Sequence, residues 1–132
     1  MSFPILAAGK VANVSRRKTG YFPSYKSAAM IIRIVRMEFR PEEMDRFQQV
    51  FDRYKHRIRA FPGCRLLELH RDSLNADVRY TYSIWDSEQS LESYRTSTLF
   101  SDTWAQAKTL FAAPPQAFSL EKMEEVQDFQ DF

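Results

Sequence analysis

The segment CRLLELHRDSLNADVRYTYSIW, residues 64–85, carries the clearest pattern of secondary structure in the chain, and the fold prediction starts from it. Two runs rich in apolar and β-branched side chains, 64–71 and 78–85, flank the polar stretch 72–77. Runs of this composition, separated by a short polar turn, are typical of two antiparallel strands. The segment therefore predicts a β-hairpin.

Alternation along 78–85 gives the second strand two different faces. One face is apolar and aromatic and carries Val78, Tyr80, Tyr82 and Ile84. The other face is small and polar but ends in tryptophan, and carries Arg79, Thr81, Ser83 and Trp85. An apolar cavity with a few hydroxyl groups is typical of a small-molecule site, whereas plain hydrophobic core is the alternative interpretation.

Upstream of the hairpin, residues 31–39 have the apolar, β-branched composition of a strand. After Pro41 the period changes, and apolar residues recur every three or four positions: Met44, Phe47, Phe51, Tyr54, Ile58 and Phe61. This spacing predicts an amphipathic helix of about five turns. Pro62 and Gly63 end it.

Downstream of the hairpin, residues that cap helix N-termini stand at 86–87 and 97–98, and they predict two further helices. Residues 117–123 predict a fourth strand. The order strand, helix, strand, strand, helix pair, strand is that of an α+β, ferredoxin-like βαββαβ fold, with helices on one face of an antiparallel sheet. The bare face, with Tyr80 and Tyr82, predicts a homodimer in which two sheets close on each other.

The two ends of the chain differ from the middle in composition. Residues 1–29 contain five basic and no acidic residues and no sustained apolar period, so we expect a disordered or non-native N-terminal extension. A transit peptide, a basic arm and translation from an early start codon are three interpretations, and Met30, directly before the first strand, favours the last. We expect the domain to span 30–125 and residues 126–132 to form an acidic C-terminal tail.

Composition also excludes several classes of function. No apolar run reaches the roughly 18–20 residues of a membrane-spanning helix, and charges after residue 29 are mixed in sign, so we expect no membrane and no nucleic-acid partner. The single cysteine, Cys64, forms no intrachain disulfide, which is typical of a cytoplasmic protein. Two histidines and one cysteine cannot supply a four-ligand zinc site, and the three glycines lack the spacing of a nucleotide loop, so we predict neither metal nor cofactor.

Several motifs resemble the antibiotic biosynthesis monooxygenase (ABM) domain family over residues 30–125. They are Pro62-Gly63-Cys64, Leu69-His70-Arg71-Asp72, Trp85-Asp86-Ser87-Glu88, and the following Leu91, Tyr94, Arg95, Ser97 and Leu99-Phe100. The resemblance implies a dimeric α+β barrel with a ligand cavity between helices and sheet. It also implies oxygenation of electron-rich aromatics or quinols without metal or flavin.

The resemblance bears on individual residues as well. Trp85 stands where the family usually has tryptophan, whereas Tyr94 and Leu99 stand where many members carry histidines. Haem-degrading relatives share the fold but need an axial histidine where this chain has Trp104, and an indole cannot ligate iron. A haem-binding or haem-degrading protein is therefore the least favoured alternative.

We expect a cofactor-independent monooxygenase acting on an aromatic, phenolic or quinol-type small molecule, and a non-catalytic dimeric binding module of the same fold is the alternative. The expected ligand-binding residues are Thr81, Ser83, Trp85, Tyr94, Phe100 and Trp104. The candidate catalytic residues are Tyr94, whose hydroxyl can hydrogen-bond a substrate oxygen, and Arg33 or Arg36, whichever points inward to stabilise a phenolate.

Overall fold

Strands β2 (Cys64–Arg71) and β3 (Val78–Trp85) form the predicted hairpin in the computed structural model, which describes residues 29–129. Asp72 shapes its turn, because the carboxylate accepts hydrogen bonds from the backbone N–H groups of Leu74 and Asn75 at 3.1 and 3.0 Å. A side-chain oxygen that binds the backbone two or three residues ahead is a common way to fix a turn.

Strand β1 (Ile31–Glu38) occupies the centre of the sheet, between β3 and β4 (Gln116–Leu120). The order is β2-β3-β1-β4 and every neighbouring pair is antiparallel, which confirms the predicted α+β, ferredoxin-like arrangement. The prediction that the fourth strand runs to residue 123 is wrong. It ends at Leu120, whose partner Ile32 lies at the beginning of β1, so β1 offers no further length with which residues 121–123 could pair.

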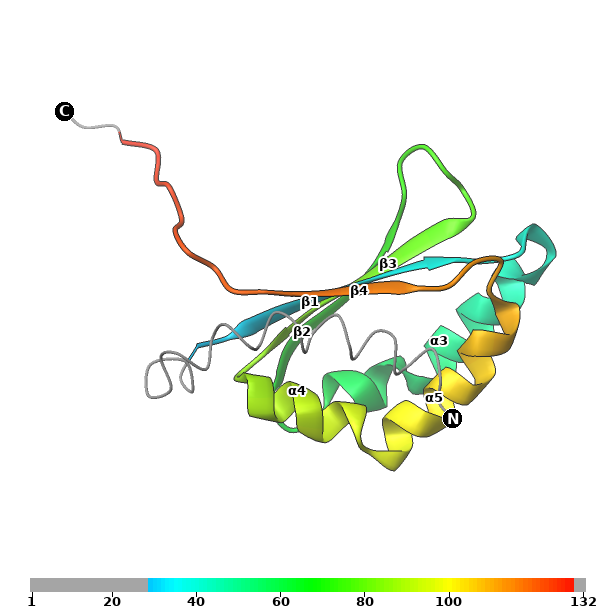
Figure 1. Ribbon diagram of the computed structural model, residues 1–132, viewed down its shortest axis with the longest axis horizontal. Helices are drawn as coiled ribbons and strands as arrows, with labels where there is room; N and C mark the ends of the chain where they lie inside the picture. The colour runs from blue at the N-terminus through cyan, green and yellow to red at the C-terminus, as the bar shows by residue number, and fades with distance from the viewer. Residues whose placement is uncertain (1–28, 130–132) are drawn as a thin grey trace.

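The helices of residues 29–129 all lie on one face of this sheet (Figure 1). They are the short 3-10 helix η1 (Pro41–Glu43), α3 (Met44–Arg59), α4 (Glu88–Arg95), α5 (Thr98–Ala107) and the 3-10 helix η2 (Lys108–Leu110). The predicted long helix is therefore split at Met44 and ends before Phe61.

Serine side chains fix the beginnings of α4 and α5. The hydroxyl of Ser87 accepts the N–H of Ser90, and the hydroxyl of Ser97 accepts the N–H of Phe100, both at 3.1 Å. Each cap satisfies an N–H that has no partner inside its helix. The two caps place α4 and α5 one after the other along the helical side of the sheet.

The core lies between the helices and the sheet, in two clusters of buried residues. The larger cluster comprises Met37, Phe39, Phe47, Val50, Tyr54, Ile58, Trp104 and Leu110. The smaller cluster comprises Ile31, Cys64, Trp85 and Leu91. The first draws mainly on α3, and the second brings α4 against the beginnings of β1 and β2.

The ends of the chain lie largely outside the described part. The predicted extension, residues 1–29, lies outside it except for residue 29. Residues 121–129 form no helix or strand and run away from the sheet (Figure 1), and 130–132 lie outside the described residues. Over residues 29–129, none of the helices has the length and apolar character needed to span a lipid bilayer.

We expect Gly63→Ala to destabilise the protein by about 2–4 kcal/mol. Gly63 has φ of +91°, a conformation that L side chains rarely adopt, and an added Cβ would lie 2.5 Å from Cβ and Oγ of Ser90. Urea-induced unfolding measures the loss. In a Ser90→Gly background the clash is gone, so Gly63→Ala should then cost only the backbone part, about 1–2 kcal/mol. Unchanged stability of the single variant would contradict this account.

Candidate functional site

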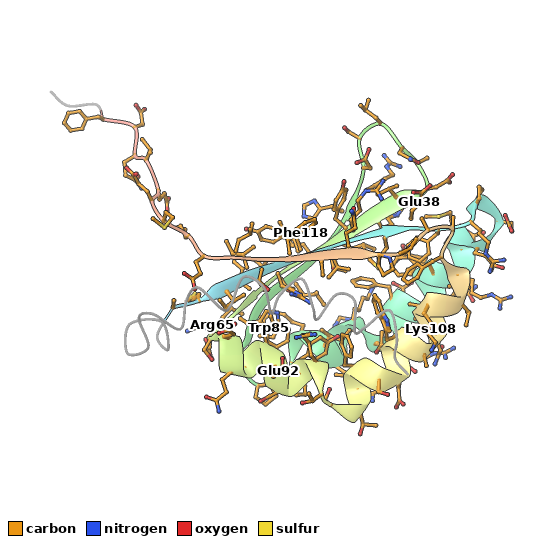
Figure 2. The ribbon with its side chains drawn as sticks, viewed as in Figure 1. Glu38, Arg65, Trp85, Glu92, Lys108 and Phe118 are labelled. Atoms are coloured by element: carbon orange, nitrogen blue, oxygen red, sulfur yellow. The ribbon has the colours of Figure 1, made fainter. Side chains whose placement is uncertain are left out.

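Strands β1 and β3 direct alternate side chains towards the helices. The strand register pairs Arg33 with Ser83 and Val35 with Thr81, and these side chains lie on the helical side of the sheet. Trp85 lies two residues beyond Ser83 and so belongs to the same face. Figure 2 shows Trp85 between the sheet and the helices.

A cavity of about 100 Å³ lies between the sheet and the helices. The strands contribute Arg33, Val35, Met37, Leu67, Thr81, Ser83 and Trp85. The helices contribute Phe47, Val50, Phe51, Ile58, Leu91, Tyr94, Arg95, Phe100, Thr103, Trp104 and Ala107. All six residues expected to bind a ligand are among these, and the lining is mostly apolar.

Four aromatic rings follow one another along one side of the cavity, and we call them the aromatic wall. Tyr94 stacks on Trp85 with ring centroids 5.0 Å apart and meets Phe100 edge-on at 5.2 Å. Phe100 in turn stacks on Trp104 at 5.8 Å. Offset stacking and edge contacts are the favoured aromatic geometries, so the wall offers flat surface for a planar ligand.

Ser83 orients Trp85 through a buried hydrogen bond. The indole Nε1 of Trp85 donates to the Ser83 hydroxyl at 3.0 Å, and that hydroxyl donates to the backbone carbonyl of Arg33 at 3.5 Å. The single O–H of Ser83 is therefore engaged within the sheet. Thr81 differs, because its hydroxyl has no hydrogen-bond partner among residues 29–129 and remains available to a ligand.

Arg33 is a buried cation at the cavity, with 5% of its surface exposed. Its Nη1 donates to the hydroxyl of Ser119 at 2.8 Å, and no carboxylate in residues 29–129 lies within ion-pair distance. Burial, and secondarily the positive charge of Arg95, lowers the pKa of Arg33 to about 10, while Glu92 opposes the shift. Arg33 therefore still carries its charge at neutral pH.

Tyr94 brings a neutral hydroxyl to the cavity. Burial raises the pKa of its phenol, and the nearby Cys64 acts in the same direction. Within residues 29–129 the hydroxyl has no hydrogen-bond partner. A protonated phenol of this kind can donate to a ligand oxygen.

Arg36 and both histidines lie away from the cavity. Alternation along β1 puts Arg36 on the face opposite Arg33, where its guanidinium lies 3.7 Å from the carboxylate of Glu38. Of the two arginines considered as phenolate partners, only Arg33 points inward, and Arg36 leaves the candidate site. His56 is exposed on α3, and His70 lies on the bare face of the sheet, 2.8 Å from Glu68.

The described residues offer no cluster for a metal ion. Within residues 29–129, no three His, Cys, Asp or Glu side chains lie close enough to hold one. Cys64 is buried, and burial raises the pKa of its thiol, so at neutral pH it packs as a thiol against Trp85 and Leu91.

Arg95 belongs to one of the motifs that resemble the ABM family, but it was not among the residues expected to bind a ligand or to act in catalysis. It stands four residues after Leu91, the buried residue of α4, and residues at this spacing share one helical face. Its Nη1 donates to Glu92 at 2.9 Å, and 12% of its side chain is exposed. The spacing from Leu91 is the sequence signal that could have revealed it.

The antibiotic biosynthesis monooxygenase family matches residues 30–106 of the chain. The chain belongs to this family. The matched segment runs from the residue before β1 into α5, and so includes every described cavity-lining residue except Ala107. No curated protein matches the sequence significantly.

Solved structures share the ABM fold. A candidate ABM protein from Caulobacter crescentus is 19% identical with a TM-score of 0.71, covering 79% of this chain and 99% of that one. A Mycobacterium tuberculosis protein is 21% identical with a TM-score of 0.69, covering 75% and 100%. A conserved Methanosarcina mazei protein is 15% identical with a TM-score of 0.69, covering 75% and 98%. Identities this low establish the fold alone.

Proposed function

We propose that the protein is a cofactor-independent monooxygenase that oxidises a phenol or hydroquinone in the cavity described above. The observation that carries the proposal is Arg33, a buried cation without a carboxylate partner in residues 29–129, placed beside the aromatic wall. A cation in an apolar site stabilises the anion of a bound phenol far more than it would in water.

The reaction then needs only the substrate and dioxygen. The phenolate donates electrons to dioxygen and forms a C–O bond at a ring carbon that carries hydrogen, opposite its own oxygen in a phenol and next to that oxygen in a hydroquinone. The resulting hydroperoxide loses water and leaves a quinone. One oxygen atom enters the product, the other leaves as water, and the phenol supplies all four electrons that reduce dioxygen.

The chain's own residues bind and orient rather than transfer electrons. Arg33 stabilises the phenolate, the Tyr94 hydroxyl donates a hydrogen bond to a ligand oxygen, and the aromatic wall holds the ring. Among the described residues, those that line the cavity include no imidazole and no carboxylate. The substrate must therefore lose its proton on entry, and Arg33 favours that loss.

The size of the cavity limits the substrate. At about 100 Å³ it is smaller than the roughly 150 Å³ that accommodates a benzene ring in an engineered protein cavity. A one-ring ligand therefore enters only if lining side chains move apart. Two of them, Tyr94 and Phe100, are half-buried and lie where α4 passes into α5.

A non-catalytic binding module is the second candidate, and the lack of a histidine among the cavity residues in the described range 29–129 favours it. Such a module would bind the same flat aromatic ligands through the same wall. Dioxygen consumption distinguishes the two, because only the enzyme consumes it.

We also propose a homodimer in which the bare faces of two sheets close on each other. This face carries Ile32, Ile34, Leu66, Tyr80, Tyr82, Ile84, Phe118 and Leu120. Phe118 and Leu120 are 43% and 46% exposed, and Phe118 lies on the side of the sheet away from the helices (Figure 2). Polar side chains, Arg36, Glu68 and His70, share this face, but an exposed group of apolar and aromatic residues of this size marks an interaction surface.

After treatment with a metal chelator, we expect the protein to consume dioxygen with one or more members of a panel of substituted phenols and hydroquinones. We expect Tyr94→Phe to slow this turnover by about tenfold or more while still binding the same compounds. An oxygen electrode measures turnover, and tryptophan fluorescence measures binding. The reason is that the variant keeps the ring of the aromatic wall but loses the only hydroxyl of Tyr94.

Tyr54→Phe is the matched control, because its hydroxyl accepts a hydrogen bond from Gln106 and does not line the cavity. Its turnover should equal that of the wild type. Unchanged turnover in Tyr94→Phe would remove Tyr94 from the mechanism. Saturable binding without dioxygen consumption across the whole panel would establish the binding module instead.

A further inference from the structure

Arg95 presents one unused edge of its guanidinium group. Nη1 donates to Glu92 at 2.9 Å, whereas Nε is buried and has no partner in residues 29–129. Nη2 likewise has no hydrogen bond to the described residues. Nε and Nη2 lie side by side, and their parallel N–H groups match the two oxygens of a carboxylate.

Arg33 adds a second guanidinium to the same cavity. Among residues 29–129 it donates a side-chain hydrogen bond only to the hydroxyl of Ser119, and the positive charge of Arg95 helps to lower its pKa. Within residues 29–129 the two arginines share one acidic neighbour, Glu92, whose side chain is 54% exposed. Uncompensated positive charge in an apolar cavity is unfavourable, and an anionic ligand removes that cost.

Trp104 supplies a further unused donor. Across residues 29–129, two buried side-chain nitrogen or oxygen atoms have no hydrogen-bond partner, Nε of Arg95 and Nε1 of Trp104. Both belong to residues that line the cavity. Buried donors are almost always satisfied in proteins, so two orphaned donors around one cavity indicate oxygen atoms of a ligand.

We infer that the aromatic substrate of this cavity also carries a carboxylate group, an inference that rests on the proposed use of the cavity as the substrate site. The free edge of Arg95 holds both carboxylate oxygens, Arg33 supplies the second positive charge, and the ring lies on the aromatic wall. A phenol offers one oxygen and must lose a proton before it becomes an anion. A carboxylate has two and is already charged at neutral pH.

The test compares benzoate with benzamide, which has nearly the same shape and no charge. The chain has two tryptophans, Trp85 and Trp104, and both line the cavity, so intrinsic fluorescence reports binding directly. We expect benzoate to bind the full-length protein at least about tenfold more tightly than benzamide. Equal affinities would overturn the inference.

Substitutions assign the preference to the two arginines. Arg95→Gln should reduce benzoate affinity by about tenfold or more and leave benzamide affinity unchanged, and Arg33→Met should do the same. The second variant keeps the test decisive if the first fails to fold. Arg46→Gln is the control, because it removes the same charge from a side chain on α3 that is 66% exposed, and it should bind benzoate as the wild type does.

A third probe, phenol, separates carboxylate from phenolate. If phenol binds as tightly as benzoate and releases a proton, measured by calorimetry in two buffers, the site holds a phenolate and the inference is wrong. Its failure is distinguishable from failure of the proposed function. If the protein prefers benzoate but consumes dioxygen with no substrate, only the proposed monooxygenase function is wrong. If it consumes dioxygen but binds benzoate and benzamide equally, only the inference of a carboxylate group is wrong.

Discussion

Trp85→Ala should lower the free energy of unfolding by about 3–5 kcal/mol, the cost typical of truncating a large buried aromatic. Trp85 is 1% exposed, packs with Ile31, Cys64 and Leu91, and stacks on Tyr94. The same indole lines the cavity. The substitution therefore removes core packing and a ligand-contacting surface at once, and urea-induced unfolding measures the first of these losses.

Trp85→Phe separates the two roles of this residue. It keeps an aromatic ring but loses the hydrogen bond to Ser83, so we expect a smaller loss, about 1–2 kcal/mol, in a protein that still folds and still binds flat ligands. If Trp85→Ala instead unfolds at the same urea concentration as the wild type, Trp85 contributes little to the core and acts only as a cavity wall.

Tyr82→Asp should convert the proposed dimer into a monomer, raising the dissociation constant by about a thousandfold or more. Tyr82 lies mid-strand on the bare face of the sheet, paired with Ile34 on β1 and Glu68 on β2. Dimer formation would bury the new carboxylate opposite an apolar partner surface. Sedimentation should then give 15.6 kDa for the variant and twice that mass for the wild type.

The control for this prediction is Gln49→Asp, which adds the same charge on the exposed face of α3 and should leave the dimer intact. A wild-type protein that sediments as a stable monomer at micromolar concentration would refute the dimer altogether. A Tyr82→Asp protein that still sediments as a dimer would place the interface on another surface.

The hairpin was predictable to the residue because two independent signals coincide. Strand composition and a turn with Asp72 and Asn75 fix both ends of β2 and β3. The end of β4 was not predictable from its own residues, because it depends on where β1 begins. Phe61 has the spacing of the helical stripe, but the chain has already left α3 at Arg59.

The candidate site was only partly predictable, for a related reason. Strand alternation placed Thr81, Ser83 and Trp85 on one face, and the structure has them around the cavity. Alternation could not decide whether Arg33 or Arg36 points inward. It shows that the two side chains lie on opposite faces of β1, but which face is inward depends on the side of the sheet that the helices cover. Arg95 was identified in a family motif but not as a site residue, because its position at the cavity depends on how α4 packs against the sheet.

The central position of β1 has a consequence for how the protein is made. The β2–β3 hairpin joins neighbouring segments and can form early, whereas β1 pairs with strands that the ribosome delivers much later, and contacts of large sequence separation form slowly. Arg33 meets Ser119 across 86 residues. A nascent or truncated chain that ends before β4 therefore exposes one edge of β1 and has no Ser119 to bind Arg33. We expect such chains to aggregate through that edge, and the last strand to be the step that commits the chain to the native state.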